Sequence, residues 1–287
     1  MITNIEYVSK MLPEFDDYIH KGHRGRVLII GGSTGLTGAV CMCANAALKS
    51  GAGLITAAVP RSLNNIFEIK LTEVMTCPVD DKDGDITVNS VRQILTVADK
   101  CDAVAIGPGA GVGNGVRAVL EELCMTAKKM IIDADAINVL AINPDILKES
   151  KADVLLTPHI GEMSRLCGNS CEEISNKRTE YAVSFANEYN VNILLKGKNT
   201  VITNGKDVFV NPTGNNGMAK GGSGDVLTGI CVALAAQGLP TFESGIAGAY
   251  IHGLAGDIAK EKFTDFSMTP CDIIDNLGIA FKKITEI

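Results

Sequence analysis

Short runs of apolar residues alternate along this chain with longer segments of mixed polarity. The first run, residues 26–30 (RVLII), ends at a pair of glycines, and a second run over residues 54–59 ends at Pro60. Between them, residues 38–50 are rich in small side chains and close at another glycine turn. These patterns predict a buried strand, a helix that packs closely on a sheet, and a second strand.

The alternation continues to the C-terminus. Further strands are predicted at residues 102–106, 129–132, 152–156, 192–196, 200–203 and 208–210. Helices are predicted at about 116–127, 175–188, 226–237, 243–259 and 270–283. Asn204-Gly205 is a hairpin signal between the last two strands. We therefore expect an α/β fold with a mostly parallel central sheet, helices on both faces, and a late antiparallel hairpin. No linker divides the chain, so residues 1–287 are interpreted as one domain.

Composition and charge narrow the function classes. The chain has 287 residues, of which 46% are hydrophobic, and a formal net charge of −7. This acidity argues against a nucleic-acid partner but leaves a nucleotide ligand open, because backbone amides can hold phosphates. The N-terminus lacks a signal-peptide pattern, and no apolar stretch is long enough to span a membrane. The nine cysteines form no CxxC pair, which favours buried thiols over a zinc site. We expect a cytoplasmic protein.

The glycine-rich turn at residues 221–225 (GGSGD) is the sharpest chemical signal. Glycines allow backbone amides to approach an anion closely, and the helix that opens near Asp225 adds partial positive charge there. A carboxylate beside a bound phosphoryl group would suit a general base that acts on a hydroxyl. The alternative is that Asp225 is simply an N-cap after a flexible turn.

Other polar loops also follow predicted strands, where parallel sheets carry their ligands. Residues 157–162 (TPHIGE) include His159, which is either a ligand-binding residue or a loop histidine. Glu162 fits an acidic residue of a first helical turn. Residues 196–200 (KGKNT) join two predicted strands and fit an ordinary charged hairpin turn. Asp133 and Asp135 could serve a phosphate and metal region, or Asp135 could cap the next helix.

Eight short motifs, in order, resemble those of the ADP/ATP-dependent NAD(P)H-hydrate dehydratase family of the ribokinase-like superfamily. They are KGHRG at 21–25 with Gly31-Gly32, TGA at 37–39, SGAG at 50–53, GPG at 107–109, DADAIN at 133–138, TPHIGE at 157–162, KGKNT at 196–200 and GGSGD at 221–225. The resemblance covers almost the whole chain from Gly22 onward. It implies a ribokinase-like fold.

The resemblance also implies a reaction. The substrate is a hydrated nicotinamide cofactor, NADHX or NADPHX, whose added hydroxyl is phosphorylated by ADP or ATP and then leaves as phosphate, which restores NADH or NADPH. Asp225 would activate the hydroxyl, and the segment Gly222, Ser223 and Gly224 would stabilise the transferring phosphoryl group. The remaining implied contacts are Ala39, Gly107, Gly109, His159 and Asp225 to the hydrated cofactor; Lys196, Gly197, Lys198, Asn199, Thr200 and Gly224 to ADP or ATP; and Glu162 to Mg²⁺ through water.

Two rival functions remain beside this one. A vitamin-precursor or sugar kinase of the same fold would use the same base and anion site, although His159 and the segments around Gly38 and Gly107 favour the dehydratase. A non-catalytic nucleotide-binding protein would be expected to have a degraded site. The family's frequent epimerase domain is not expected here, since only a short stretch precedes Lys21, so we predict action on the S epimer. The resemblance favours ADP as the phosphoryl donor and a homotetramer as the assembly. The sequence leaves open the choice of nucleotide and of NADHX or NADPHX.

Overall fold

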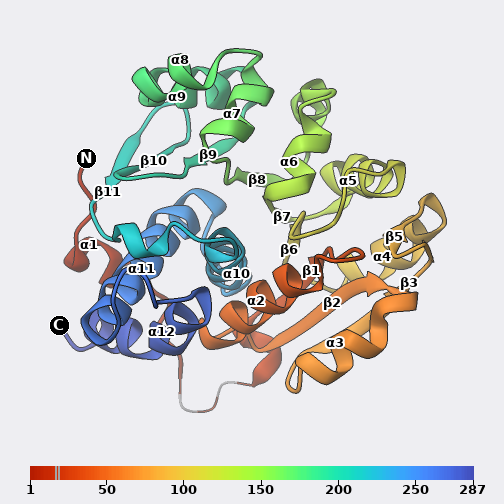
Figure 1. Ribbon diagram of the computed structural model, residues 1–287, viewed down its shortest axis with the longest axis horizontal. Coiled ribbons are helices and arrows are strands. Elements are labelled where there is room, and N and C mark those ends of the chain that lie inside the picture. The colour runs from red at the N-terminus through yellow and green to blue at the C-terminus, as the bar shows by residue number, and fades with distance from the viewer. Residues whose placement is uncertain (17, 19) are drawn as a thin grey trace.

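A nine-stranded sheet forms the centre of the computed structural model, which describes residues 1–16, 18 and 20–287 (Figure 1). Its strand order is β11-β10-β9-β8-β7-β6-β1-β2-β3. The strands are β1 Arg26–Ile30, β2 Leu54–Pro60, β3 Met75–Val79, β6 Ala103–Ile106, β7 Lys129–Ile132, β8 Asp153–Leu156, β9 Asn192–Leu195, β10 Thr200–Thr203 and β11 Val208–Asn211. Two short strands, β4 Asp81–Lys82 and β5 Asp85–Ile86, pair separately.

The sheet is parallel from β3 to β9 and antiparallel beyond it. β10 pairs antiparallel with β9 as well as with β11. The prediction of a mostly parallel sheet with a late antiparallel hairpin is therefore confirmed. The antiparallel part is one pairing larger than predicted, because residues 196–199 form a tight connection between β9 and β10.

Helices cover both faces of the sheet. They are α1 Ile5–Ser9, α2 Thr37–Lys49, α3 Asn64–Lys70, α4 Val91–Ala98, α5 Asn114–Thr126, α6 Ala134–Leu140, α7 Ile160–Cys167, α8 Cys171–Asn176, α9 Arg178–Tyr189, α10 Ser223–Ala236, α11 Thr241–Lys262 and α12 Pro270–Thr285. Short 3₁₀ helices span Lys21–Arg24, Arg61–Leu63, Val88–Ser90, Pro144–Glu149 and Asn216–Met218. Within the described residues, no helix is both long and apolar enough to cross a membrane.

Alternation along the buried strands divides the core between the two faces. In β1, Val27 and Ile29 pack with α2 and α10, whereas Leu28 and Ile30 join the cluster beneath α4 to α9. A third apolar cluster lies among α1, α10, α11 and α12. Because α10 is buried along nearly its whole length, its first turn has a fixed place relative to the sheet.

Several short elements were missing from the sequence prediction. Helices α3 and α4, the edge strand β3 and the pair β4–β5 all lie between residues 64 and 98, where no element was predicted. Helix α7 has only eight residues and begins directly after the loop that contains His159. The helix predicted over residues 175–188 was wrong as a single element: the chain breaks at Lys177 into α8 and α9.

The parallel register brings the predicted loops to one edge of the sheet. Ile106 pairs with Ile132, and Ile132 pairs with Leu156. Residues that directly follow these strands, such as Gly107 and Asp133, therefore emerge side by side at the carboxyl edge. β9 runs parallel to β8 and ends at the same edge.

Candidate active site

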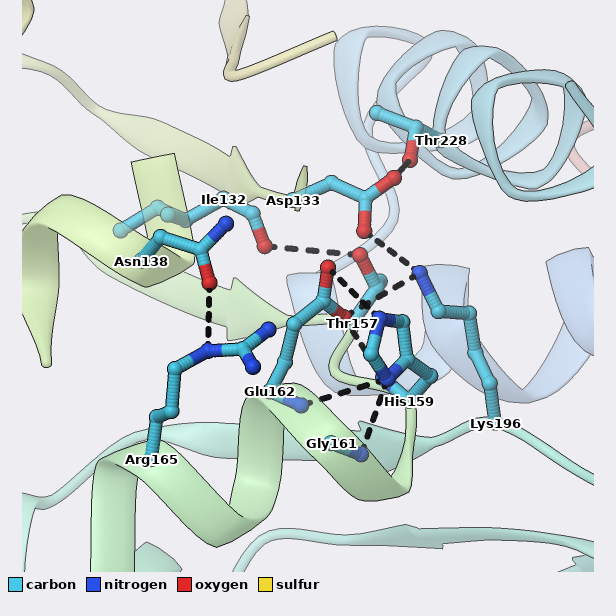
Figure 2. A network of polar contacts seen from close by, with 10 residues as sticks. All are labelled: Ile132, Asp133, Asn138, Thr157, His159, Gly161, Glu162, Arg165, Lys196 and Thr228. Carbon is cyan, nitrogen blue, oxygen red and sulfur yellow. Dashed lines mark hydrogen bonds and ion pairs between the residues drawn. The ribbon is translucent and has the colours of Figure 1, made fainter. Parts of the chain in front are cut away.

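The buried carboxylate of Asp133 joins two parts of the site. It follows β7 and is only 1% exposed. Its Oδ1 accepts a hydrogen bond from Lys196 Nζ at 2.7 Å, and its Oδ2 accepts one from Thr228 Oγ1 at 2.7 Å. Figure 2 shows Asp133 between these two partners, one following β9 and the other on α10. Asp133 therefore fixes α10 to the sheet edge.

The Lys196 ammonium is shared between two carboxylates. Besides Asp133 it lies 3.7 Å from Glu162 Oε2, and both carboxylates raise its pKa against the opposing effect of burial. The sequence interpretation gave Lys196 a charge for the nucleotide. That prediction stands, since Lys196 lines the cavity at the start of the 196–200 turn, and the structure adds that two acidic side chains balance its charge.

His159 caps helix α7 and faces the same cluster. Its Nδ1 accepts hydrogen bonds from the backbone amides of Gly161 at 2.9 Å and Glu162 at 3.2 Å, and Glu162 Oε2 accepts one from the His159 amide at 2.7 Å. This is a capping box with histidine as the cap. Burial, followed by the positive charges of Lys196 and Arg165, lowers the pKa of His159. A neutral ring whose Nδ1 accepts must carry its proton on Nε2. His159 therefore combines both sequence readings: it holds its loop and presents a donor.

The first turn of α10 forms the glycine-rich part of the site. Gly222 is the N-cap with a φ of 102°, and a Cβ there would lie 2.6 Å from Met42 Cε. A Cβ on Gly224 would lie 3.3 Å from Lys196 Nζ. The Val226 amide is bonded back to Gly222 O at 3.1 Å and the Ser223 amide to Lys220 O at 3.2 Å, so within the described residues the amides of Gly224 and Asp225 are the ones left without a partner at the helix end. The N-cap reading of Asp225 is wrong, because Asp225 is the third residue of α10.

Asp225 has an acidity suited to proton transfer at neutral pH. Burial, reinforced by the negative charge of Asp133, raises its pKa to about 7, and Lys196 offsets part of the shift. Perturbed carboxylates of this kind are characteristic of functional sites. Asp225 can therefore accept a proton from a hydroxyl more readily than an ordinary aspartate.

The turn at residues 196–200 has an unusual backbone. Gly197 has a φ of 146° and Asn199 a φ of 54°, and Thr200 Oγ1 donates to Gly197 O at 2.8 Å. Glycine and asparagine are the residues that adopt positive φ most readily. The turn lies at the sheet edge between β9 and β10, as the sequence predicted.

A cavity of about 1220 Å³ joins these segments. Most of the predicted site residues line it: His159, Glu162, Lys196, Gly197, Lys198, Asn199, Thr200, Gly222, Ser223, Gly224 and Asp225. The sequence analysis did not assign the loop at 211–216 or His252 of α11, which also line it. Burial lowers the pKa of His252 to about 4, so its ring is neutral. His252 lies in a helical segment rich in small residues, and that sequence pattern does not indicate that the histidine borders a cavity.

Ala39, Gly107 and Gly109 are close to this cavity but do not line it. A Cβ on Gly109 would lie 3.2 Å from that of Ala39, and one on Gly107 would lie 1.8 Å from Asp133 O. Both positions favour glycine because their φ angles are positive and because a Cβ would meet neighbouring backbone atoms. Their glycines are therefore explained by packing, without a ligand. The group adjoins the site through α2, because Met42, one turn after Ala39, contacts Gly222.

Asp135 holds the neighbouring glycine loop. Its Oδ2 accepts a hydrogen bond from the Gly111 amide at 2.9 Å. The suggestion that Asp135 caps the next helix is wrong, because α6 begins at Ala134 with Asp133 in the N-cap position. Asp133 and Asp135 therefore act on different neighbours despite their spacing.

The fit of a magnesium ion depends on Glu162. Its Oε2 accepts from the His159 amide, and its Oε1 lies 3.4 Å from His159 Nε2. In the described part of the chain no group of three or more His, Cys, Asp or Glu side chains could hold a metal ion by itself. The donor set suits a magnesium ion bound mainly by nucleotide phosphates, with Glu162 reaching it through water.

Comparisons with known proteins identify a matching sequence family. A sequence model of the NAD(P)H-hydrate dehydratase family matches residues 27–278. A bifunctional NAD(P)H-hydrate repair enzyme from Moorella thermoacetica is 42% identical over 284 residues, which are 98% of this chain and 53% of that protein. The chain thus spans about half the length of the curated relatives it matches.

Solved structures show the same architecture. The ADP/ATP-dependent NAD(P)H-hydrate dehydratase from Bacillus subtilis, co-crystallised with ATP and Mg²⁺, is 28% identical with a TM-score of 0.83, covering 99% of this chain and 98% of that one. A ribokinase-like superfamily protein from Enterococcus faecalis is 26% identical with a TM-score of 0.85, covering 100% and 96%. The predicted ribokinase-like fold is confirmed.

Proposed function

Because this chain belongs to the NAD(P)H-hydrate dehydratase family, we propose that it converts the hydrated cofactors (S)-NADHX and (S)-NADPHX back to NADH and NADPH at the expense of ADP or ATP. It would thus act as a lyase that repairs nicotinamide cofactors. The observation that carries this proposal is Asp225, a carboxylate with a pKa of about 7 in the first turn of α10, on the wall of a cavity large enough for a nucleotide.

The proposed reaction has two steps. Asp225 accepts the proton of the substrate hydroxyl, whose oxygen attacks the terminal phosphoryl group of the nucleotide. The leaving group is AMP when ADP is the phosphoryl donor and ADP when ATP is the donor. The bond between the ring carbon and the phosphorylated oxygen then breaks with loss of a neighbouring ring proton, which releases phosphate and the repaired cofactor. In this proposal the Gly222–Gly224 segment at the start of α10 would stabilise charge on the transferring group, with the Gly224 amide as the donor that no backbone carbonyl of the described residues occupies.

Two substrates would occupy the two sides of α10. We place ADP or ATP in the cavity along residues 196–200 and Gly224. We place the hydrated nicotinamide on the side of Ala39, Gly107 and Gly109, with His159 Nε2 as a hydrogen-bond donor. Asp225, which lines the cavity, would then act between the two substrates, as a phosphoryl transfer requires. Magnesium would enter with the nucleotide and shield its phosphate charge, with Glu162 contacting it through water.

The surroundings of the enzyme are also proposals. All nine cysteines are free thiols, and seven of them have a pKa raised by burial, which suits a reducing cytoplasm. We propose a homotetramer, which analytical ultracentrifugation would test. No nucleic acid or membrane partner is proposed.

One assay tests the proposed function. Purified protein is incubated with (S)-NADHX and ADP or ATP, and NADH absorbance and phosphate are followed together. We expect one phosphate released for each NADH formed. Turnover of another alcohol with retention of the phosphate in the product, and no NADH formed, would show a small-molecule kinase instead.

A further inference from the structure

Arg178 reaches the nucleotide-binding turn from outside every motif of the sequence analysis. It is the first residue of α9, directly after the break at Lys177. Its Nη1 donates to Lys198 O at 2.6 Å and to Asn199 O at 3.3 Å, and its Nη2 donates to Leu195 O at 2.8 Å. One guanidinium therefore joins the end of β9 to the far side of the turn. In Figure 1, α9 lies against β9 and β10, which the turn connects.

The turn needs such support because of its backbone. Gly197 and Asn199 both have positive φ, so the chain between β9 and β10 is far from the strand conformation. The three carbonyls that Arg178 binds lie on either side of Gly197, whose ideal Cβ would be 3.1 Å from Nη2. The planar guanidinium has several donors in fixed directions, so it can bind these three carbonyls at once better than a single ammonium group can.

The charge of Arg178 is also unbalanced. Within the described residues no carboxylate lies within 4.0 Å of it, and its three hydrogen bonds are to neutral carbonyls. The guanidinium is half-buried, and an arginine stays protonated even though burial lowers its pKa. Lys196 has the opposite arrangement, since two carboxylates neutralise it. Arg178 thus adds an unpaired positive charge behind this wall of the cavity, besides those of Lys198 and Lys220, which line the cavity and have no carboxylate within 4.0 Å among the described residues.

We propose that Arg178 is the positioning residue of the nucleotide-binding turn and supplies an unpaired positive charge that favours the phosphates of ADP or ATP. The inference rests on the proposed function, because it assumes that the turn binds the nucleotide. It predicts two separable effects. Loss of the guanidinium hydrogen bonds weakens the binding of any ligand that contacts the turn. Loss of the positive charge weakens only the binding of phosphorylated ligands.

The test compares Arg178→Leu with Arg178→Lys, with Arg117→Leu as a control at an exposed arginine of α5. Calorimetry measures the binding of adenosine and of ADP without the hydrated cofactor, and kinetics give kcat and both KM values. We expect Arg178→Leu to weaken ADP binding by about tenfold or more. Adenosine binding should fall less, and the KM of the hydrated cofactor should change little. Arg178→Lys should recover the preference for ADP over adenosine.

The outcomes separate the two proposals. If Arg178→Lys and Arg178→Leu bind ADP as tightly as the wild type, Arg178 has no positioning role. Equal increases in both KM values, or a reduced melting temperature without a change in nucleotide affinity, would also overturn it by showing a general structural role. A wild-type protein that binds ADP through Arg178 but never forms NADH would refute the dehydratase proposal alone. Should Arg178→Leu fail to fold, Arg178→Gln removes the charge with less disturbance.

Discussion

Lys196 Nζ and Asp133 Oδ1 lie 2.7 Å apart, although the two residues are 63 positions apart in the sequence. Their contact joins the ends of β7 and β9 directly beneath Gly224. Asp133 is 1% exposed at its side chain and Lys196 19%. A pair so well shielded from water contributes by mutual neutralisation: Asp133 without Lys196 would be a buried charge without a counterion, and Lys196 without Asp133 would keep only Glu162, at 3.7 Å.

Breaking this pair should destabilise the fold. We expect Asp133→Asn and Lys196→Met each to lower the free energy of unfolding by about 3 kcal/mol, because the remaining charge stays buried. The double variant should lose less than the sum of the two, since it leaves neither charge unpaired. Urea denaturation of all four proteins measures this coupling. Additive losses would mean that the pair is not a unit.

Replacement of Asp225 should separate binding from catalysis. Asp225→Asn keeps the size and polarity of the side chain but cannot accept a proton as a carboxylate does. We expect kcat to fall by about 10²- to 10⁴-fold while ADP still binds. The matched control is Glu243→Gln on α11, away from the lining of the cavity. A variant with nearly normal kcat would remove Asp225 from the role of base.

The pKa of Asp225 links rate and stability to pH in opposite directions. Its folded value of about 7 lies above the ordinary 3.8, so the folded protein binds this proton more tightly than the unfolded chain. The stabilisation is complete below about pH 4 and is lost as pH rises through about 7. The rate should instead fall as pH decreases through about 7, because the base becomes protonated. Melting temperatures of wild type and Asp225→Asn between pH 4 and 8 check this: their difference should change only within that window.

Two variants of His159 should distinguish its two contacts. Asparagine can still cap α7, whereas alanine cannot, so His159→Ala should lose about 1 kcal/mol of stability and His159→Asn much less. Both variants lack the Nε2 donor, and both should raise the KM of the hydrated cofactor. Thermal denaturation and steady-state kinetics provide the two measurements. A KM that rises only in the alanine variant would mean that the histidine acts through its cap.

The sequence identified the parts of the site that are local along the chain. The glycine turn before Asp225 and the loops after the strands carry their own signals, since glycine and strand ends mark where backbone can approach a ligand. Residues whose place in the site depends on contacts between distant parts of the chain were harder to predict from the sequence. The pairing of Lys196 with Asp133 was not predicted, because the two residues follow different strands and are far apart in the sequence. Arg178 and His252 lie in ordinary helical sequence, and only the packing of α9 and α11 brings them to the site.

The position of Asp225 has a consequence for how the nucleotide binds. An anion that settles on the first turn of α10 adds negative charge beside a carboxylate that is already half-protonated near neutrality. Nucleotide binding and proton uptake are then linked quantities, so the apparent affinity depends on pH through Asp225 as well as through the terminal phosphate, whose second pKa is about 6. The measured heat of binding would then differ between buffers, because the proton comes from the buffer and each buffer has its own enthalpy of ionisation. The protein would thus take up, on meeting its co-substrate, a proton that it must release before it can act on the hydroxyl.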